Sequence, residues 1–351
     1  MGRDFVAGAA NMRQASASLD ERRKAPPPSQ CSDVGPTQSF VKQLDLRVDI
    51  LSTAQEREDE AMGQYDHLIG EELVSGTWSW ESDRALLYAV GVGAGLDDAQ
   101  KELHFTTENT PGQPQQVIPT FATLMGLKSD WVERLGWVSE GLSPVGMVHG
   151  EQAVTLARPL PVRGSARLST VLRGVYDKGS GALVVKETRL SLADTGEYLG
   201  STFMRLFAQG KGGFGGPRAP EGEVPWVHPE REPDAIVSLP VGINQSLIYR
   251  LSGDRHPHGT QVGRARQDGF ERPIFYGLGT FGVACRALLR GLCDGDAAQF
   301  GHMEGRFSKP VFPGDRLDTL IWRTIDGALY QVLANGERIV LDRGRFRYLK
   351  T

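Results

Sequence analysis

Cysteine is scarce in this chain of 351 residues, which contains only Cys31, Cys285 and Cys293 and no Cys-x-x-Cys pair. This scarcity excludes a disulfide framework and a cysteine-ligated metal site, and it predicts a reducing, intracellular compartment. An excess of positive charge is also missing, because 39 basic side chains stand against 43 acidic ones, a net charge of −4. Nucleic-acid binding normally requires a basic face, so no nucleic-acid partner is expected.

Long apolar runs and targeting signals are lacking as well. No apolar stretch approaches the roughly 18 residues needed to cross a bilayer, so no membrane partner is expected. The N-terminus lacks the apolar core of a secretory signal, and the final Tyr-Leu-Lys-Thr is not a peroxisomal Ser-Lys-Leu signal. We therefore expect a soluble intracellular protein, either peroxisomal or cytoplasmic.

Two glycine-rich stretches fail as nucleotide-binding motifs. The run Gly91-Val-Gly-Ala-Gly95 has Leu96 where a dinucleotide fingerprint needs glycine, and helical residues precede it. A close approach of two helices, or a helix end, is the favoured interpretation. The run Gly212-Gly-Phe-Gly-Gly216 has no following Lys-Ser/Thr, so it is not a phosphate-binding loop and is interpreted as a connector.

The patterns along the chain predict two copies of one unit. Residues 1–45 form a polar tail that is too poor in apolar anchors to fold. We assign residues 46–210 to an N-terminal unit, 211–233 to a linker and 234–351 to a C-terminal unit. The stretch Ala85-Leu-Leu-Tyr88 in the first unit matches Ser246-Leu-Ile-Tyr249 in the second.

Apolar spacing predicts a helix starting at Ser82 or Asp83, a short helix after Pro119 and a long helix over 273–292. Segments rich in Val, Thr and Leu, separated by turn residues, predict β-strands; these are 154–160, 167–176, 183–192, 198–207, 303–312, 317–324, 330–332 and 339–348. The sequence therefore predicts an α+β protein in which antiparallel sheet and helix occur twice.

The stretch from Gln245 carries the most specific motif, Ser252-Gly-Asp254-Arg-His256-Pro-His258-Gly259, followed by Pro273-Ile-Phe-Tyr276-Gly277. With Ile118-Pro-Thr-Phe121 and Arg306-Phe-Ser-Lys-Pro-Val-Phe-Pro-Gly314, it resembles the MaoC-like (R)-specific enoyl-CoA hydratases, or hydratase 2. The resemblance covers about residues 62–350. It implies a tandem (double) hot-dog fold, in which each repeat wraps an antiparallel sheet around a long helix.

The resemblance also implies an activity and a site. Such enzymes interconvert a trans-2-enoyl-CoA and a (3R)-3-hydroxyacyl-CoA, with an acid/base carboxylate and a backbone N–H at the thioester oxygen. On this chain the implied residues are Asp254 and Gly277 for catalysis, and His149, Gly150, Lys178, Phe307, Glu108 and His256 for substrate binding. Lys178 would meet a CoA phosphate, and Phe307 would contact the thioester. CoA is part of the substrate, so no cofactor is expected, and a homodimer is implied.

One departure affects the chemistry directly. The family has a catalytic histidine five residues after the aspartate, where this chain has Gly259, and Tyr276 replaces a further histidine. In one interpretation His258 or His256 supplies the missing base, and we name His258 as the catalytic candidate. In the other, Asp254 works alone and the protein is a weak hydratase or an acyl-CoA-binding protein. A metal held by Asp254, His256 and His258 is not expected, because no further ligand cluster completes it.

Overall fold

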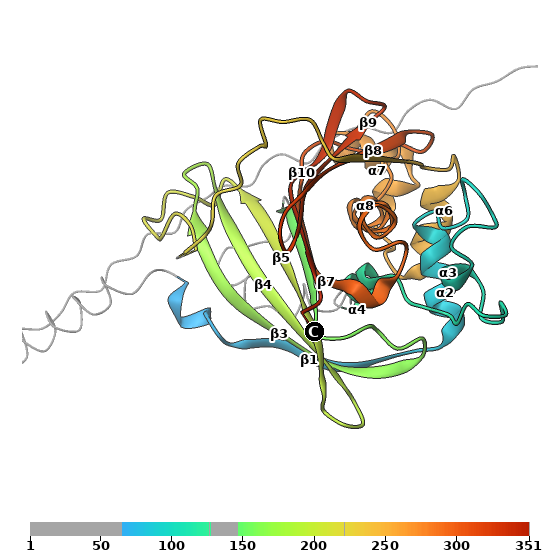
Figure 1. Ribbon diagram of the computed structural model, residues 1–351. Helices are drawn as coiled ribbons and strands as arrows, with labels where there is room; N and C mark the ends of the chain where they lie inside the picture. Colours follow the sequence, from blue (N-terminus) through green and yellow to red (C-terminus); the bar gives the residue numbers. More distant parts are fainter. Residues whose placement is uncertain (1–64, 126, 128–146, 221, 351) are drawn as a thin grey trace, which may run out of the picture. The chain divides into compact units, whose positions relative to one another are not determined.

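The computed structural model describes residues 65–125, 127, 147–220 and 222–350 (Figure 1). The predicted tail over 1–45 and the predicted start of the first unit lie outside the described residues. All described residues belong to one compact unit, Glu60–Thr351. No helix among them is both long and apolar enough to cross a membrane.

A ten-stranded antiparallel sheet forms the frame, in the order β1-β3-β4-β5-β2-β7-β10-β9-β8-β6. Five strands come from each half of the chain. They are β1 (Glu72–Trp80), β2 (Met147–Leu156), β3 (Gly164–Asp177), β4 (Gly181–Leu192), β5 (Tyr198–Gln209), β6 (Ala235–Pro240), β7 (Phe300–Phe307), β8 (Arg316–Arg323), β9 (Gly327–Ala334) and β10 (Arg338–Tyr348).

The two halves meet where β2 pairs with β7, with Gln152 opposite Gly305 and Thr155 opposite His302. Backbone hydrogen bonds therefore run without interruption from one repeat into the other. Tight hairpins make this topology possible. Gly179 and Gly196 adopt φ angles of +77° and +74° in the two hairpin turns, which glycine reaches without steric cost.

One long helix fills the concave side of the sheet. Helix α8 (Gly277–Leu292) has its residues from Leu278 to Leu289 all buried and contacts β6, β8, β7 and β2. Figure 1 shows α8 almost end-on, between the strands and the remaining helices. The other helices are α2 (Ser82–Gly91), α3 (Leu103–Thr106), α4 (Ala122–Met125), α6 (Gln245–Tyr249) and α7 (Val262–Gln267), with short 3₁₀ turns η1 (Asp66–Leu68), η2 (Pro119–Phe121), η3 (Arg250–Ser252), η4 (Pro257–Gly259) and η5 (Ala297–Gln299).

The matching stretches of the two halves lie against each other. Helices α2 and α6 are in contact, and the rings of Tyr88 and Tyr249 are 6.3 Å apart between centroids. A Cβ on Gly91 would stand 3.1 Å from the Cα of Tyr249, so the small residue permits the close approach. This confirms the interpretation of the Gly91–Gly95 run as a helix–helix contact.

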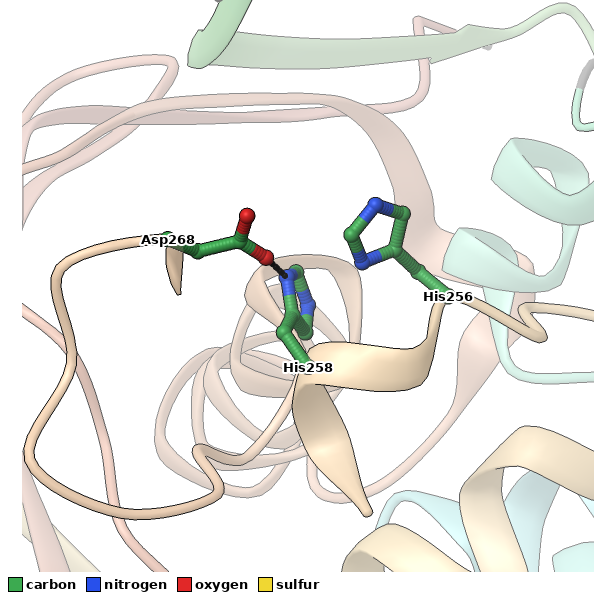
Figure 2. Close-up of side chains that lie close together, drawn as sticks. All are labelled: His256, His258 and Asp268. Atoms are coloured by element: carbon green, nitrogen blue, oxygen red, sulfur yellow. Dashed lines mark ion pairs between the residues drawn. The ribbon is translucent and has the colours of Figure 1, made fainter. Parts of the chain in front are cut away.

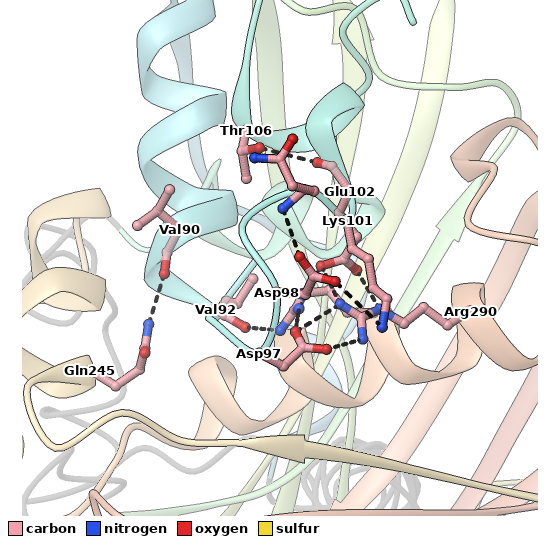
Figure 3. A network of polar contacts seen from close by, with 11 residues as sticks. Val90, Val92, Asp97, Asp98, Lys101, Glu102, Thr106, Gln245 and Arg290 are labelled. Atoms are coloured by element: carbon pink, nitrogen blue, oxygen red, sulfur yellow. Dashed lines mark hydrogen bonds and ion pairs between the residues drawn. The ribbon is translucent and has the colours of Figure 1, made fainter. Parts of the chain in front are cut away.

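A buried ion-pair network fixes α8 to the segment after α2 (Figure 3). The Nη2 atom of Arg286 lies 2.5 Å from Oε2 of Glu102, and Arg286 is fully buried. Arg290 pairs with Asp97 at 2.7 Å and with Glu102 at 2.8 Å. Glu102 has a left-handed φ of 59°, which is uncommon for a non-glycine residue and which the two arginines stabilise here.

The structure confirms most of the predicted elements and adds two strands as well as the short helices α3 and α7. The helix from Ser82, the helix ending at Leu292 and the eight predicted strands are present, with ends shifted by up to seven residues. Strands β1 and β6 were not predicted. Both lie at the edges of the sheet, where one neighbour is missing and the sequence pattern is correspondingly weaker.

Candidate functional site

Asp254 lies in the loop that links η3 to η4. The chain turns at Gly253, the residue just before Asp254, whose φ is +133°. The carboxylate accepts a hydrogen bond from the backbone N–H of His256, with 3.4 Å between nitrogen and Oδ1. Burial raises the pKa of Asp254 to about 6, and the single backbone hydrogen bond offsets only part of this. Near neutral pH the group can both accept and return a proton.

Two tyrosines flank this carboxylate. Tyr249 and Tyr276 lie 5.2 Å apart between ring centroids, and burial together with the charge of Asp254 raises the pKa of Tyr276 to about 12. The hydroxyl of Tyr249 is buried and has no hydrogen-bond partner among the residues described. A buried hydroxyl without a partner costs about 1–3 kcal/mol, so a ligand that accepts a bond from it would gain that energy.

The family histidine is missing for a structural reason. Gly259 is buried against the ring of Tyr276, and a Cβ added there would stand 2.4 Å from Cε2. The Tyr276 hydroxyl also donates a hydrogen bond of 2.8 Å to the carbonyl oxygen of His256. The two departures from the family pattern are therefore complementary, because the larger residue at 276 occupies the space next to the smaller one at 259.

The neighbouring histidines turn toward Asp268 instead of Asp254 (Figure 2). Nδ1 of His258 lies 3.6 Å from Oδ2 of Asp268, and the rings of His256 and His258 are 4.1 Å apart. Burial, with the neighbouring His256 as a further cause, lowers the pKa of His258 to about 4. Among the described residues, neither imidazole forms a hydrogen bond or an ion pair with the Asp254 carboxylate, so a catalytic role for His258 stays a prediction.

Gly277 is the first residue of α8, directly after Tyr276. The N–H groups in the first turn of a helix have no acceptor within the helix, and the positive end of the helix dipole adds to their attraction for negative charge. The helix is 16 residues long and its other end is anchored by Arg290 and Glu102. Gly277 thus lies at the positive end of α8, and its role as an oxyanion donor stays a prediction.

Three of the predicted substrate-binding residues gather around this helix start. Phe307 on β7 covers Gly277, since a Cβ on the glycine would stand 3.4 Å from the Phe307 ring. The ring of His149 on β2 meets Phe307 edge-on at 4.9 Å, and Gly150 follows at a break in the β2–β5 register. Burial lowers the pKa of His149 to about 4, and Lys186 contributes, so this imidazole is neutral at physiological pH.

Among the described residues, neither Lys178 nor Glu108 contacts the group formed by His149, Gly150, Phe307 and Gly277. Lys178 lies in the turn between β3 and β4 and donates a hydrogen bond to the carbonyl oxygen of Arg218. Glu108 is exposed. Its segment bonds to the chain just after the far end of α8, where His104 Nε2 lies 3.0 Å from the Gly295 carbonyl oxygen. Gly277 is at the opposite end of this 16-residue helix, which is about 24 Å long at 1.5 Å per residue. Both roles stay predictions.

Sequence reasoning missed two residues here, Tyr249 and Asp268. Tyr249 was noted only as part of the repeat, although its position five residues before Asp254 was a signal that the two could share a site. Asp268 had no such signal. Its carboxylate reaches His258 because η4 and α7 fold back on each other, which the sequence pattern did not indicate.

A separate hollow of about 670 Å³ lies at the other end of β2 and is lined by residues that include Arg158, Ser165 and Asp194. Most of the 10-residue strand β2 separates the hollow from His149. The hollow carries none of the predicted site residues, so the chemistry is assigned to the Asp254 region.

Comparisons with known proteins agree with this architecture. Residues 78–210 match the model of the MFE-2 hydratase 2 N-terminal domain, and residues 226–334 match that of the MaoC-like domain. The chain is 40% identical over 281 residues to the 3-hydroxyacyl-thioester dehydratase Y of Mycobacterium tuberculosis, covering 78% of this chain and 94% of that protein. It is 32% identical to the peroxisomal enoyl-CoA hydratase 2 of Arabidopsis thaliana, over 76% and 89% of the two chains.

A solved structure extends the agreement to the fold. The MaoC-like dehydratase from Phytophthora capsici superposes with a TM-score of 0.70 at 27% identity and covers 78% of this chain and 94% of that one. The predictions of a double hot-dog fold and of a hydro-lyase family are confirmed by these relatives. The chain belongs to the hydratase 2 family of MaoC-like, double hot-dog proteins.

Proposed function

We propose that this protein catalyses the reversible hydration of trans-2-enoyl-CoA to (3R)-3-hydroxyacyl-CoA in fatty-acyl metabolism. The observation that carries the proposal is the combination of Asp254, a carboxyl whose pKa is raised to about 6, with the start of α8 at Gly277. Tyr276 connects them, because it precedes Gly277 and its pKa responds to the charge of Asp254. A proton acceptor and an oxyanion donor are the two elements that this reaction requires.

The reaction balances with Asp254 as the only proton carrier. The carboxylate accepts a proton from water while the water oxygen forms a bond to C3 of the enoyl thioester. The C2=C3 π electrons move onto the thioester oxygen as an enolate. The enolate then collapses, C2 takes the proton from the Asp254 carboxyl, and the carboxylate is regenerated. A pKa of about 6 suits both transfers near neutral pH.

The enolate is stabilised at the N-terminus of α8. Its oxygen would accept a hydrogen bond from the N–H of Gly277, and the helix dipole would favour the developing charge. The ring of Phe307 packs next to this position. Loss of such a donor commonly costs about 10²–10³ in turnover, so this contact is a main part of the proposed catalysis.

The remaining parts of the proposal concern binding and assembly. The acyl tail would lie under the N-terminal repeat, CoA would enter as part of the substrate, and no separate cofactor takes part in hydration. Lys178 at its hairpin turn would contact a CoA phosphate. We also propose that the chain forms a homodimer and acts in a peroxisomal or cytoplasmic compartment, and light scattering of the purified chain tests the first of these.

The test measures the loss of enoyl-thioester absorbance with crotonyl-CoA and with a decenoyl-CoA. Wild type is compared with Asp254→Asn, which keeps the shape of the side chain and removes the base. We expect turnover to fall by about 10²–10⁴, with CoA-ester affinity changed by less than about threefold, since a general base acts mainly in the transition state.

Asp294→Asn is the matched control, because Asp294 is exposed and has the left-handed φ of 50° that asparagine tolerates well. It should keep full activity. Equal turnover in wild type and Asp254→Asn would contradict the role of Asp254. Saturable CoA-ester binding without turnover in the wild type would instead identify an acyl-CoA-binding protein that has lost the chemistry together with the histidine at 259.

A further inference from the structure

Two of the seven histidines of the chain converge with Asp268 beside the candidate catalytic loop. The ligand atoms of His256, His258 and Asp268 all lie within 4.8 Å of one another, and Figure 2 shows the two rings and the carboxylate facing a common point. We propose that these three side chains form a binding site for one divalent transition-metal ion, with Zn²⁺ as the best-fitting ion.

The geometry is close to that of an occupied site. Zinc binds imidazole nitrogen and carboxylate oxygen at about 2.0–2.2 Å in a tetrahedron, so ligand atoms stand about 3.3–3.5 Å apart. Nδ1 of His258 and Oδ2 of Asp268 are already 3.6 Å apart. The ligand atom of His256 lies within 4.8 Å of the other two, so its ring must move inward by up to about 1.4 Å to reach the tetrahedral spacing. His256 is exposed, which leaves its ring room for this movement.

The chain fixes the other two ligands before any ion arrives. His258 packs edge-on against Phe270 at 6.1 Å between ring centroids. The Asp268 carboxylate is held by Nε of Arg264, at 2.9 and 3.0 Å from its two oxygens. An outer partner of this kind orients a ligating carboxylate, and each carboxylate oxygen keeps a lone pair for the ion.

The donor set selects the kind of ion. Two imidazoles and one carboxylate suit zinc, copper, iron or nickel, whereas magnesium and calcium prefer oxygen ligands only. Three protein ligands leave the fourth tetrahedral position for water, which the exposure of His256 makes accessible. Arg264 is the cation that faces the site, and it limits the affinity to a moderate value without blocking the imidazole nitrogens.

This site is separate from the acid/base carboxylate. The sequence suggested only Asp254 as a carboxylate ligand, and no metal was expected on that basis. The structure brings in Asp268 from beyond α7 and leaves Asp254 out of the cluster. The hydration proposed above needs no ion, so metal binding can succeed or fail independently of catalysis.

The experiment titrates Zn²⁺ into the full chain, free of any histidine tag and stripped with a chelator, by calorimetry and by competition with a chromogenic chelator. We expect one ion per chain. His256→Ala, His258→Ala and Asp268→Asn should each weaken binding at least tenfold. Asp268→Asn is nearly isosteric and His256 is exposed, so these two variants test the site even if His258→Ala folds poorly.

His67→Ala is the matched control, since His67 is an exposed histidine outside the cluster, and it should bind like wild type. Replacing Zn²⁺ by Co²⁺ should give the visible absorption of a four-coordinate site in wild type and not in Asp268→Asn. The proposal is wrong if one-to-one binding is absent at 100 μM free Zn²⁺, about a 5.5 kcal/mol threshold, or if His256→Ala and Asp268→Asn bind as tightly as wild type.

Discussion

The segments that follow the two matching helices place carboxylates in opposite surroundings. After α2, burial alone would raise the pKa of Glu102, but hydrogen bonds and charges from Arg290 and Arg286 outweigh it and lower the pKa. After α6 and η3, burial raises the pKa of Asp254 to about 6 and no arginine offsets it. The same local architecture thus gives a structural anion in one repeat and, in the other, the carboxyl that we propose as the proton carrier.

The difference comes from the partners that α8 supplies to each side. Its C-terminal half carries Arg286 and Arg290 toward the N-terminal repeat. Its N-terminus carries Gly277, preceded by the neutral Tyr276, toward the C-terminal loop. A charged partner fixes an ionised carboxylate, whereas apolar and phenolic neighbours leave its protonation open. Helix α8 therefore has the stabilising ion pairs of Arg286 and Arg290 at its C-terminal half and the proposed catalytic loop at its N-terminus.

Removing the anion of the N-terminal repeat should have the largest effect. Glu102→Gln leaves Arg286 buried without its main counter-charge, and breaking such a pair costs about 3–5 kcal/mol. Chemical denaturation at pH 7 measures the loss. Because the folded-state pKa of Glu102 is lowered from 4.5, its stabilisation is present above that pH and shrinks below it, so wild type and variant should converge in acid.

Turnover per folded molecule of Glu102→Gln should match wild type, which separates this anion from the reactive one. Asp98→Asn, a neighbour whose ion pair with Lys101 spans 3.9 Å at the surface, is the control and should change stability by less than about 1 kcal/mol. A large loss of kcat at normal stability in Glu102→Gln would place Glu102 in the reactive site and break the comparison.

The two matching tyrosines provide the next test. Tyr249→Phe removes the buried hydroxyl without a partner beside Asp254 and should lower kcat by about 10–100-fold, if that hydroxyl bonds a charged reacting group worth about 1.5–3 kcal/mol. Stability should not fall, because no existing hydrogen bond is lost. Enzyme assays and thermal unfolding on the same sample measure both effects.

Tyr88→Phe is the matched control in the other repeat. The Tyr88 hydroxyl has a partner, Oγ1 of Thr120 at 2.9 Å, so its removal should cost about 1 kcal/mol of stability and leave kcat unchanged. Identical behaviour of the two variants would mean that the repeats do not differ at this position.

Much of the fold could be predicted from the sequence, because strands with turn residues between them and an apolar helix are local patterns. The family motif located Asp254 and Gly277 by order along the chain. What could not be predicted depends on contacts between distant segments. The orientation of His258 toward Asp268 depends on how η4 packs on α7. The raised pKa of Asp254 depends on side-chain placement, because Arg250 and Arg255 are close in sequence and yet neither lowers it.

The glycine at position 259 illustrates the same limit. In the sequence, Gly259 stands where the family has its catalytic histidine, so a histidine at this position would be expected to raise activity. In the structure a Cβ there collides with the Tyr276 ring at 2.4 Å. A histidine at position 259 would therefore match the family motif but would not fit the packing, because Tyr276 fills the space next to it.

Gly259→His should accordingly destabilise the protein by about 1–3 kcal/mol, as overpacking does, and it should not raise turnover. In Gly259→His combined with Tyr276→His, the phenol ring is gone and the new imidazole gains room. A double-mutant cycle on stability and kcat measures this coupling. We expect the double variant to be more active than Tyr276→His alone; additive effects of the two changes would contradict the packing argument.

The smallest effect expected is a pH dependence that the N-terminal carboxylates cannot produce. Hydration needs Asp254 ionised, and its pKa is about 6, so kcat/KM should be constant above pH 7 and fall about tenfold per unit below pH 6. Rates are measured with a chelator present, so that any ion held by His256 and His258 does not contribute. Glu102, whose pKa is lowered from 4.5, stays ionised throughout this range.

A mid-point of the pH profile near pH 4 would mean that water or a charged partner reaches Asp254 and holds it ionised, and the contrast between the two repeats would then be lost. A mid-point near pH 6 that disappears in the residual activity of Asp254→Asn would assign the titration to this carboxyl, since the imidazole of His258, with a pKa of about 4, titrates well below it.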